Sequence, residues 1–156
     1  MVKGRVLDDI ARPRVGVAAV VWRTAERREL LLGKGHNDAA NDEIFAVTGG
    51  HWESGETLHD AAIRETREEA GVELTDLKLI SVFDFFNEEK GRSYVSIGFS
   101  AIWSHGEPEV REVEKKVNWG WYTPEQALEL PLFRPDRVLI ERAMMDGPVY
   151  EVSATK

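Results

Sequence analysis

The chain has 156 residues, which is enough for one domain of ordinary size with a hydrophobic core. It carries 20 basic and 28 acidic residues, so its net charge of −8 disfavours broad electrostatic attachment to nucleic-acid backbone or anionic membrane. Because the sequence has no cysteine, disulfide frameworks, thiolate metal sites and cysteine nucleophiles are excluded. Any metal ion must therefore be held by oxygen or imidazole ligands.

No apolar run approaches the roughly 20 residues that a membrane-spanning helix requires. The short apolar stretch at residues 15–22 partly resembles a signal peptide. However, acidic residues precede it, and Arg23 follows without a small-residue cleavage pattern. We interpret this stretch as a buried strand of a cytoplasmic protein. Residues 1–156 are expected to form a single domain, in which residues 1–12 are a loosely ordered arm.

Segments rich in β-branched and aromatic residues occupy most of the chain. Strands are expected at residues 15–22, 29–33, 44–48, 74–86, 93–103 and 117–122. Polar connections are expected at residues 23–28, 36–43 and 87–92.

Three segments favour helices. Residues 57–70 contain neither glycine nor proline, and Gly71 follows where a left-handed helix cap is expected. Pro124 suits the first turn of a short helix, and residues 137–145 form the last helix. This mixture of strands and helices predicts an α/β or α+β fold.

Three glutamates share one face of the helix predicted at 57–70. Glu65, Glu68 and Glu69 stand at positions i, i+3 and i+4, where like charges repel one another. A hard divalent cation such as Mg²⁺ would remove that repulsion and bridge the carboxylates to substrate phosphates. Arg64, one turn before Glu68, could hold a carboxylate in place. The alternative interpretation is a solvated acidic surface.

The spacing around these glutamates is more specific than their charge. Gly50 is followed after five residues by Glu56, after seven more by Arg64-Glu65, after two more by Glu68-Glu69, and then by Ala70, Gly71 and Val72. At these residues the chain resembles the Nudix hydrolases, whose signature is a loop–helix–loop. The resemblance extends over roughly residues 14–125. It implies the Nudix fold, a mixed β-sheet sandwiched between α-helices.

The chain departs from the family pattern at two positions. Thr66 stands where the family usually has an aliphatic residue, and we expect an adjustment of packing because Thr66 faces away from the glutamates. Thr48 replaces the proline that usually precedes the paired glycines, which leaves the chemistry untouched but removes a source of rigidity from the loop.

Further segments resemble the MutT-type nucleoside triphosphate pyrophosphatases. These segments are residues 15–17, 31–34, 49–51 and 55–57. Together with Glu112, Glu114, Lys115, Trp119 and Trp121, they look closest to the mammalian thiopurine-nucleotide diphosphatase branch.

The resemblance implies a role for each signature residue. Glu65, Glu68 and Glu69 correspond to metal-binding carboxylates, and the carbonyl of Gly49 is expected to add a ligand. The implied cofactor is Mg²⁺, with Mn²⁺ as a substitute. Catalysis is assigned to Glu68, Glu69 and Arg64, where Arg64 orients a glutamate.

Two further signature roles lie outside that turn of the helix. Glu56 would brace the loop against the helix. A further acidic ligand is expected from a loop before the last strand, where Glu112 and Glu114 are the candidates and Glu114 is preferred.

Three other residues are candidates for substrate binding, each with an ordinary structural alternative. Lys34 follows a strand and would meet phosphate or remain solvated. His51 lies beside the metal loop and would contact substrate or merely close the loop. Trp119 and Trp121 lie on one predicted strand, where one ring is expected to face the core and the other, for which Trp119 is the candidate, could stack on a base.

These residues favour a Mg²⁺-dependent hydrolase that cleaves a nucleoside triphosphate, (d)NTP, to the monophosphate and pyrophosphate. The partner is then a small nucleotide, not a nucleic-acid polymer or a membrane, and the protein is a monomer or a homodimer. ADP-ribose or another nucleoside-diphosphate conjugate is the main rival substrate. Family members of that kind often carry a proline some fifteen residues beyond the signature, and none occurs here between Pro13 and Pro108. A nucleotide sensor without catalysis is disfavoured, because all four signature glutamates are present.

Overall fold

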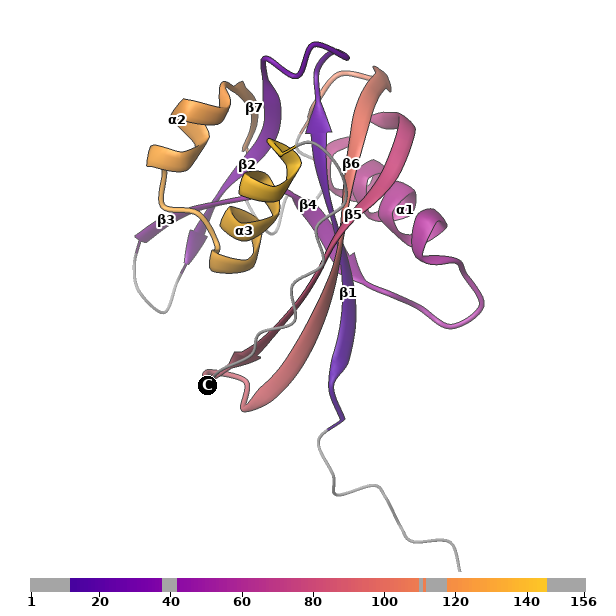
Figure 1. The fold of residues 1–156 in the computed structure, drawn as a ribbon, viewed down its shortest axis with the longest axis vertical. Coiled ribbons are helices and arrows are strands. Elements are labelled where there is room, and N and C mark those ends of the chain that lie inside the picture. Colours follow the sequence, from indigo (N-terminus) through magenta and orange to yellow (C-terminus); the bar gives the residue numbers. More distant parts are fainter. Residues whose placement is uncertain (1–11, 38–41, 110, 112–117, 146–156) are drawn as a thin grey trace, which may run out of the picture.

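The computed structural model of the chain describes residues 12–37, 42–109, 111 and 118–145. Within these residues, a seven-stranded sheet carries one helix on one face and two helices on the other (Figure 1). The strands are β1 (Arg14–Trp22), β2 (Leu30–Asn37), β3 (Asp42–Ala46), β4 (Thr48–His51), β5 (Glu73–Asn87), β6 (Arg92–His105) and β7 (Asn118–Tyr122). The helices are α1 (Leu58–Ala70), α2 (Pro124–Glu129) and α3 (Arg134–Ala143). The expected mixed sheet between helices is confirmed.

Strand β1 is the centre of the sheet, whose order is β3-β2-β1-β6-β5. It runs parallel to β6 and antiparallel to both β2 and β4. In the pairing with β4, Gly16 to Ala19 lie opposite His51 to Thr48. Strand β7 pairs with β2. The glycine pair of the sequence signature is therefore fixed against the central strand.

The two faces of β1 build two separate hydrophobic cores, because successive side chains of a strand point to opposite sides. Val17, Ala19 and Val21 pack in the core under α1, together with alanines of that helix. Ala18, Val20 and Trp22 pack in the core under α3, with Leu139 and Ile140. Burial on both faces explains why β1 is continuously apolar in sequence.

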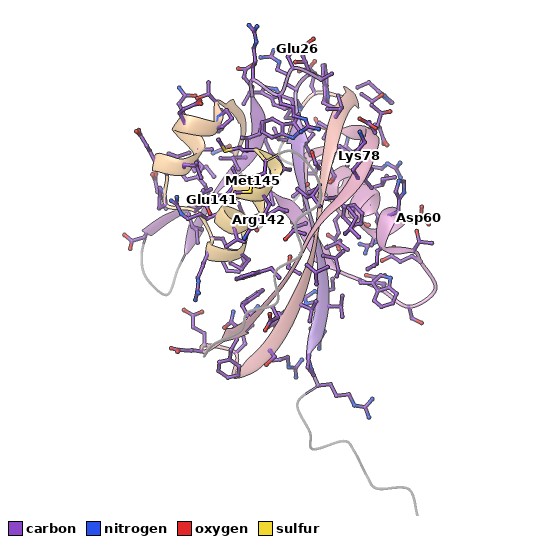
Figure 2. All side chains as sticks on the ribbon, viewed as in Figure 1. Glu26, Asp60, Lys78, Glu141, Arg142 and Met145 are labelled. Carbon is purple, nitrogen blue, oxygen red and sulfur yellow. The ribbon has the colours of Figure 1, made fainter. Side chains whose placement is uncertain are left out.

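Helix α1 begins and ends where the sequence predicts. The Thr57 hydroxyl accepts a hydrogen bond from the Asp60 N–H, and Gly71 ends the helix in the left-handed conformation at φ 72°. The helices expose charged side chains on their outer surfaces, as Figure 2 shows for Asp60 of α1 and Glu141 of α3. Among the described residues, no helix is both long and apolar enough to cross a bilayer.

Three segments differ from the sequence-based prediction. Residues 36–43 are not one loop, because β2 continues to Asn37 and pairs with β3 up to Asp42. Residues 44–48 are not one strand, because β3 ends at Ala46 and β4 begins at Thr48. Helix α3 begins at Arg134 instead of residue 137, since Pro135 is accommodated in its first turn. Apart from Arg12, the expected N-terminal arm lies outside the described residues.

Candidate active site

Strand β4 lies so close to its neighbours that only glycine fits at two positions. A Cβ atom on Gly50 would lie 2.2 Å from Cδ of Glu65, and one on Gly49 would lie 2.5 Å from the carbonyl oxygen of Val17. Both distances are far inside van der Waals contact. The paired glycines therefore allow α1 to place its glutamates directly against the backbone of β4.

The three glutamates of α1 differ in their surroundings. The backbone N–H of Gly49 donates a hydrogen bond of 2.9 Å to Oε2 of Glu69. The Glu65 side chain is 14% exposed, whereas that of Glu68 is 53% exposed. Glu65 and Glu69 thus belong to the contact between α1 and β4, and Glu68 faces solvent.

Arg64 joins the preceding loop to this face of the helix. Its guanidinium donates two hydrogen bonds to the carboxylate of Glu56, at 2.8 and 3.0 Å. It also donates to Glu65 at 2.8 Å and to Glu68 at 3.2 Å. A further bond of 3.0 Å reaches the carbonyl oxygen of His51. The planar, multidentate guanidinium is suited to such a network in a way that an ammonium group is not.

The network also fixes charge states. Hydrogen bonding to Arg64, followed by the N–H of Glu53, lowers the pKa of Glu56 to about 2. The same contact with Glu56 raises the pKa of Arg64 above its already high ordinary value. Glu56 and Arg64 therefore remain a charged pair throughout the neutral pH range.

The donor set of α1 fits a hard divalent cation, because it consists of carboxylate oxygens on adjacent turns of one helical face. Among the described residues, no three acidic or imidazole side chains converge on one point. The reason is visible in the contacts: Arg64 lies against Glu65 and Glu68, while Glu69 turns toward Gly49. In this arrangement the guanidinium supplies the positive charge that balances the glutamates.

A cavity of about 270 Å³ lies beside β4. Its walls include the backbone of Gly49 and Gly50 and the side of Glu69, so it begins at the carboxylate face of α1. Three aromatic side chains are also among its lining residues: Phe85, Tyr94 and Phe133. The rings of Phe85 and Tyr94 stack with centroids 5.4 Å apart, and Phe133 meets Phe85 edge-on at 6.0 Å.

The cavity wall also contains a buried carboxyl group, that of Asp136. Asp136 is 6% exposed, and it accepts a hydrogen bond of 3.0 Å from the N–H of Val47. Burial raises the pKa of Asp136 to about 7, against the smaller opposing effect of that hydrogen bond. A carboxyl group that is partly neutral near pH 7 is able both to donate and to accept hydrogen bonds.

Asp136 was not predicted from the sequence, because the last helix was expected to start one residue after it. An acidic residue between Pro135 and Arg137, at the start of an amphipathic helix, is the signal that the sequence offers. Phe85, in the segment predicted as a strand at residues 74–86, also lines the cavity. Neither assignment follows from local spacing, since the cavity is built from segments far apart in the chain.

The structure separates the three residues predicted to bind substrate. His51 lines the cavity. Lys34 forms an ion pair with Glu43 on the neighbouring strand, at 2.6 Å, and does not line the cavity. The indole N–H of Trp119 donates to the carbonyl oxygen of Glu69 at 3.0 Å. The rings of Trp119 and Trp121 both pack against the core under α1, so the expectation that they face opposite sides is wrong: residues two apart in a strand share a face.

Trp119 therefore supports α1 and does not line the cavity wall. Base stacking by Trp119 stays a prediction. Glu112 and Glu114, the two candidates for an additional metal ligand, lie outside the described residues.

Residues 12–143 match the family model of the NUDIX domain. The chain belongs to the Nudix hydrolase family. These enzymes generally use a divalent cation such as Mg²⁺, in agreement with the oxygen donors on α1. The finer assignment to the mammalian thiopurine-nucleotide branch is not supported by the similarities found.

Individual relatives show the same relationship. The chain is 29% identical over 128 residues to the CTP pyrophosphohydrolase of Escherichia coli, covering 82% of this chain and 89% of that protein. It is 27% identical over 148 residues, 92% of its length, to the NAD-capped RNA hydrolase NudC of Photobacterium profundum, but spans only 50% of that protein. The crystal structure of a MutT NUDIX hydrolase from Burkholderia pseudomallei superposes with a TM-score of 0.71 at 29% identity, covering 85% of this chain and 99% of that one.

Proposed function

We propose that residues 1–156 form one catalytic domain that hydrolyses a nucleoside triphosphate, (d)NTP, to the monophosphate and pyrophosphate. The observation that carries this proposal is the contact between two features: Glu69 belongs to the carboxylate face of α1 and also lines the aromatic cavity. A nucleotide could therefore place its base among the rings while its phosphate chain reaches the glutamates. Stacking of a base on an aromatic ring contributes about 1–3 kcal/mol.

The glutamates supply the chemistry at the phosphate end. Glu65, Glu68 and Glu69 would hold Mg²⁺, joined on the family resemblance by the carbonyl of Gly49 and by Glu114. When bound, such a cation neutralises charge on the phosphate chain and lowers the pKa of a water ligand. Glu68 or Glu69 is the candidate to take the proton of the attacking water, and Arg64 orients Glu68 through their 3.2 Å contact.

Water attack at the α phosphorus gives a balanced reaction. One P–O bond forms to the water oxygen, the bond to the bridging oxygen between the α and β phosphates breaks, and pyrophosphate leaves. The similarity to a CTP pyrophosphohydrolase across most of both chains supports a triphosphate substrate. Unwanted or modified nucleotides in the cytoplasm are the substrates that fit this role.

A nucleoside-diphosphate conjugate is the second candidate substrate. The similarity to a NAD-capped RNA hydrolase favours it, although the chain spans half of that relative. The net charge of −8 disfavours attachment to an RNA body, so a small conjugate such as ADP-ribose fits this second candidate better than a capped RNA does.

A screen of nucleotides with Mg²⁺, in which pyrophosphate is measured against orthophosphate, tests the proposal. The expected result is release of pyrophosphate from at least one triphosphate, with a higher kcat/KM than for ADP-ribose. In ¹⁸O-labelled water the label is expected in the monophosphate. Label in the pyrophosphate would move the attack to the β phosphorus, and faster turnover of ADP-ribose than of every triphosphate would promote the second candidate.

A further inference from the structure

Two buried hydroxyl groups meet where β4 contacts α1. Thr48 opens β4 and is 1% exposed, and Thr66 lies within α1 and is fully buried. Their Oγ1 atoms are 2.7 Å apart, the distance of a good hydroxyl–hydroxyl hydrogen bond in which either group donates. Oγ1 of Thr48 also lies 3.5 Å from the carbonyl oxygen of Ala19 in β1. The pair thus links the helix, β4 and the central strand.

This hydrogen bond belongs to a row of three contacts between consecutive residues of β4 and one turn of α1. Next to it, the N–H of Gly49 binds Glu69, and the backbone of Gly50 packs on Glu65. The expectation that Thr66 faces away from the glutamates is therefore wrong, because Thr66 meets β4 beside Glu69. Thr66 lies between Glu65 and Glu69 in sequence, so all three side chains move with the same turn of helix. The hydroxyl pair therefore fixes the position of that turn along β4 and its rotation about the helix axis.

A hydrogen bond restrains this position more sharply than an apolar contact would. It weakens steeply when its distance or angle changes, whereas apolar side chains tolerate small sliding movements. A displacement of α1 along β4 would break the bond in a buried place, leaving Thr48 only its long contact with the Ala19 carbonyl and Thr66 without the Thr48 hydroxyl. The free-energy cost of this lost hydrogen bonding opposes the displacement.

Both threonines stand at positions where the sequence departs from the Nudix pattern. Thr66 replaces an aliphatic residue and Thr48 replaces a proline. Each substitution alone would bury a hydroxyl group at a cost, but together they satisfy each other. The two departures are therefore one structural unit, in which a side-chain tether to the helix stands in for the stiff backbone of proline.

We propose that the Thr48–Thr66 pair is a positioning device that sets Glu65 and Glu69 against Gly49 and Gly50 for cation binding and hydrolysis. This inference rests on the function proposed above. Neither threonine lies at the reacting phosphate, so both act through the glutamates. Removing the two hydroxyl groups is expected to shift the positions of the Glu65 and Glu69 carboxylates while leaving both carboxylates present.

The test compares Thr48→Val, Thr66→Val, the double Val variant and Thr66→Ser. Mn²⁺ binding is measured by electron paramagnetic resonance without nucleotide, alongside kcat, KM and the melting temperature. Either single Val variant is expected to weaken Mn²⁺ binding about tenfold, in the range typical of lost outer-shell support, and to lower kcat more than it raises KM. Thr66→Ser keeps the hydroxyl group and is expected to retain the Mn²⁺ affinity of the wild-type protein. The double variant regains stability, because no buried hydroxyl is left, but does not regain Mn²⁺ affinity.

Ser100→Ala is the matched control, because it removes a buried hydroxyl that binds the Trp22 indole at 3.0 Å in the opposite core. It is expected to lower the melting temperature and leave Mn²⁺ affinity unchanged. If the Val variants behave in the same way, the pair is ordinary packing and the inference is overturned. It is also overturned if Thr66→Ser is as impaired as Thr66→Val. If Mn²⁺ binding weakens as expected but the wild-type protein hydrolyses no triphosphate, the positioning role stands and the proposed function fails.

Discussion

The two sides of β4 differ in the kind of side chains that surround them. On the α1 side, the contacts are polar and charged: Arg64 binds three glutamates, and the Gly49 N–H binds a fourth. On the α3 side, the cavity is lined by aromatic rings and by Asp136, whose carboxyl group accepts one backbone N–H. The first side keeps the Glu56 carboxylate ionised, and the second favours the neutral form of the Asp136 carboxyl group.

This difference follows from solvent access and from counter-charge. Glu56 accepts hydrogen bonds from the Arg64 guanidinium and the Glu53 N–H, so its pKa falls, whereas Asp136 is buried without a cation among its described partners, so its pKa rises. One strand thus borders both a charged end, where we propose that the phosphates bind, and an apolar end, where we propose that the base binds. If the two ends are as distinct as the contacts indicate, substitutions at each end should have separate effects.

The largest effect is expected at the charged end. Glu69→Gln keeps an oxygen that accepts the Gly49 N–H but removes a charged metal ligand. We expect kcat to fall about 10²- to 10⁴-fold, the usual contribution of an acid–base group, while the melting temperature is retained. Steady-state kinetics and thermal unfolding measure both. Glu109→Gln is the control and should have little effect, and full activity in Glu69→Gln would remove Glu69 from the reaction.

Arg64→Lys is expected to lower kcat about 10- to 100-fold, because an ammonium group cannot reproduce the bidentate contact with Glu56 and still reach the other two glutamates. Arg67→Lys is the matched control, since Arg67 binds Glu73 in the same bidentate way and, among the described residues, its guanidinium does not bind the signature glutamates. Activity assays under saturating Mg²⁺ compare the two variants. Equal losses of kcat in the two variants would mean that any weakened ion pair on α1 lowers activity, and that the contacts of Arg64 have no special role.

The apolar end is expected to respond to pH through stability. The pKa of Asp136 is raised from about 3.8 to about 7, so the unfolded state ionises first as the pH increases. Its contribution to folding is full below about pH 3.8 and is lost as the pH rises through 7. Asp136→Asn accepts the same N–H without ionising, and should melt higher than wild type at pH 8 but not at pH 4. Each kcal/mol corresponds to about 2–4 °C in a domain of this size.

Differential scanning calorimetry at the two pH values measures this difference. Asp42→Asn neutralises an exposed carboxylate of β3 and is the control. A pH dependence of Asp136→Asn identical to that of wild type would show that Asp136 titrates in its ordinary range.

The smallest effect is expected at Trp119. Trp119→Phe removes the hydrogen bond to the Glu69 carbonyl and should lower the free energy of unfolding by about 1–3 kcal/mol, with KM for nucleotide unchanged. Trp103→Phe removes a similar indole bond, to Gly106 at 2.8 Å, and is the control for urea unfolding. A clear rise in KM with unchanged stability would instead support base stacking by Trp119.

The sequence predicts the charged end of the site better than the apolar end. Helix α1 has local signals, namely the cap at Thr57, the stop at Gly71 and the glutamate spacing, so its limits and its acidic face follow from about fifteen neighbouring residues. Arg64 stands one turn from Glu68, and their contact also follows from helical geometry.

The rest depends on contacts between distant segments. The break between β3 and β4 falls at Val47, whose N–H is taken by Asp136, 89 residues further along the chain. The cavity is lined by residues of β4, of the β5–β6 pair and of the start of α3, and no local sequence pattern predicts that these segments lie together. The same holds for Thr48 and Thr66: each is visible in sequence as a departure from the pattern, but only the structure shows that they touch.

The parallel pairing of β1 with β6 has a consequence for the order of folding. Trp22 lies opposite Ile102, so the central strand gains this neighbour only after most of the chain has left the ribosome. Helix α1, with 13 residues, is too short to be stable by itself, and its glutamates meet β4 only when that strand has docked on β1. Closing such a long loop is slow relative to local helix formation. The carboxylate face is therefore complete only after β4 has docked on β1, and a substitution that delays β1–β4 docking is expected to postpone the appearance of activity without altering the finished protein.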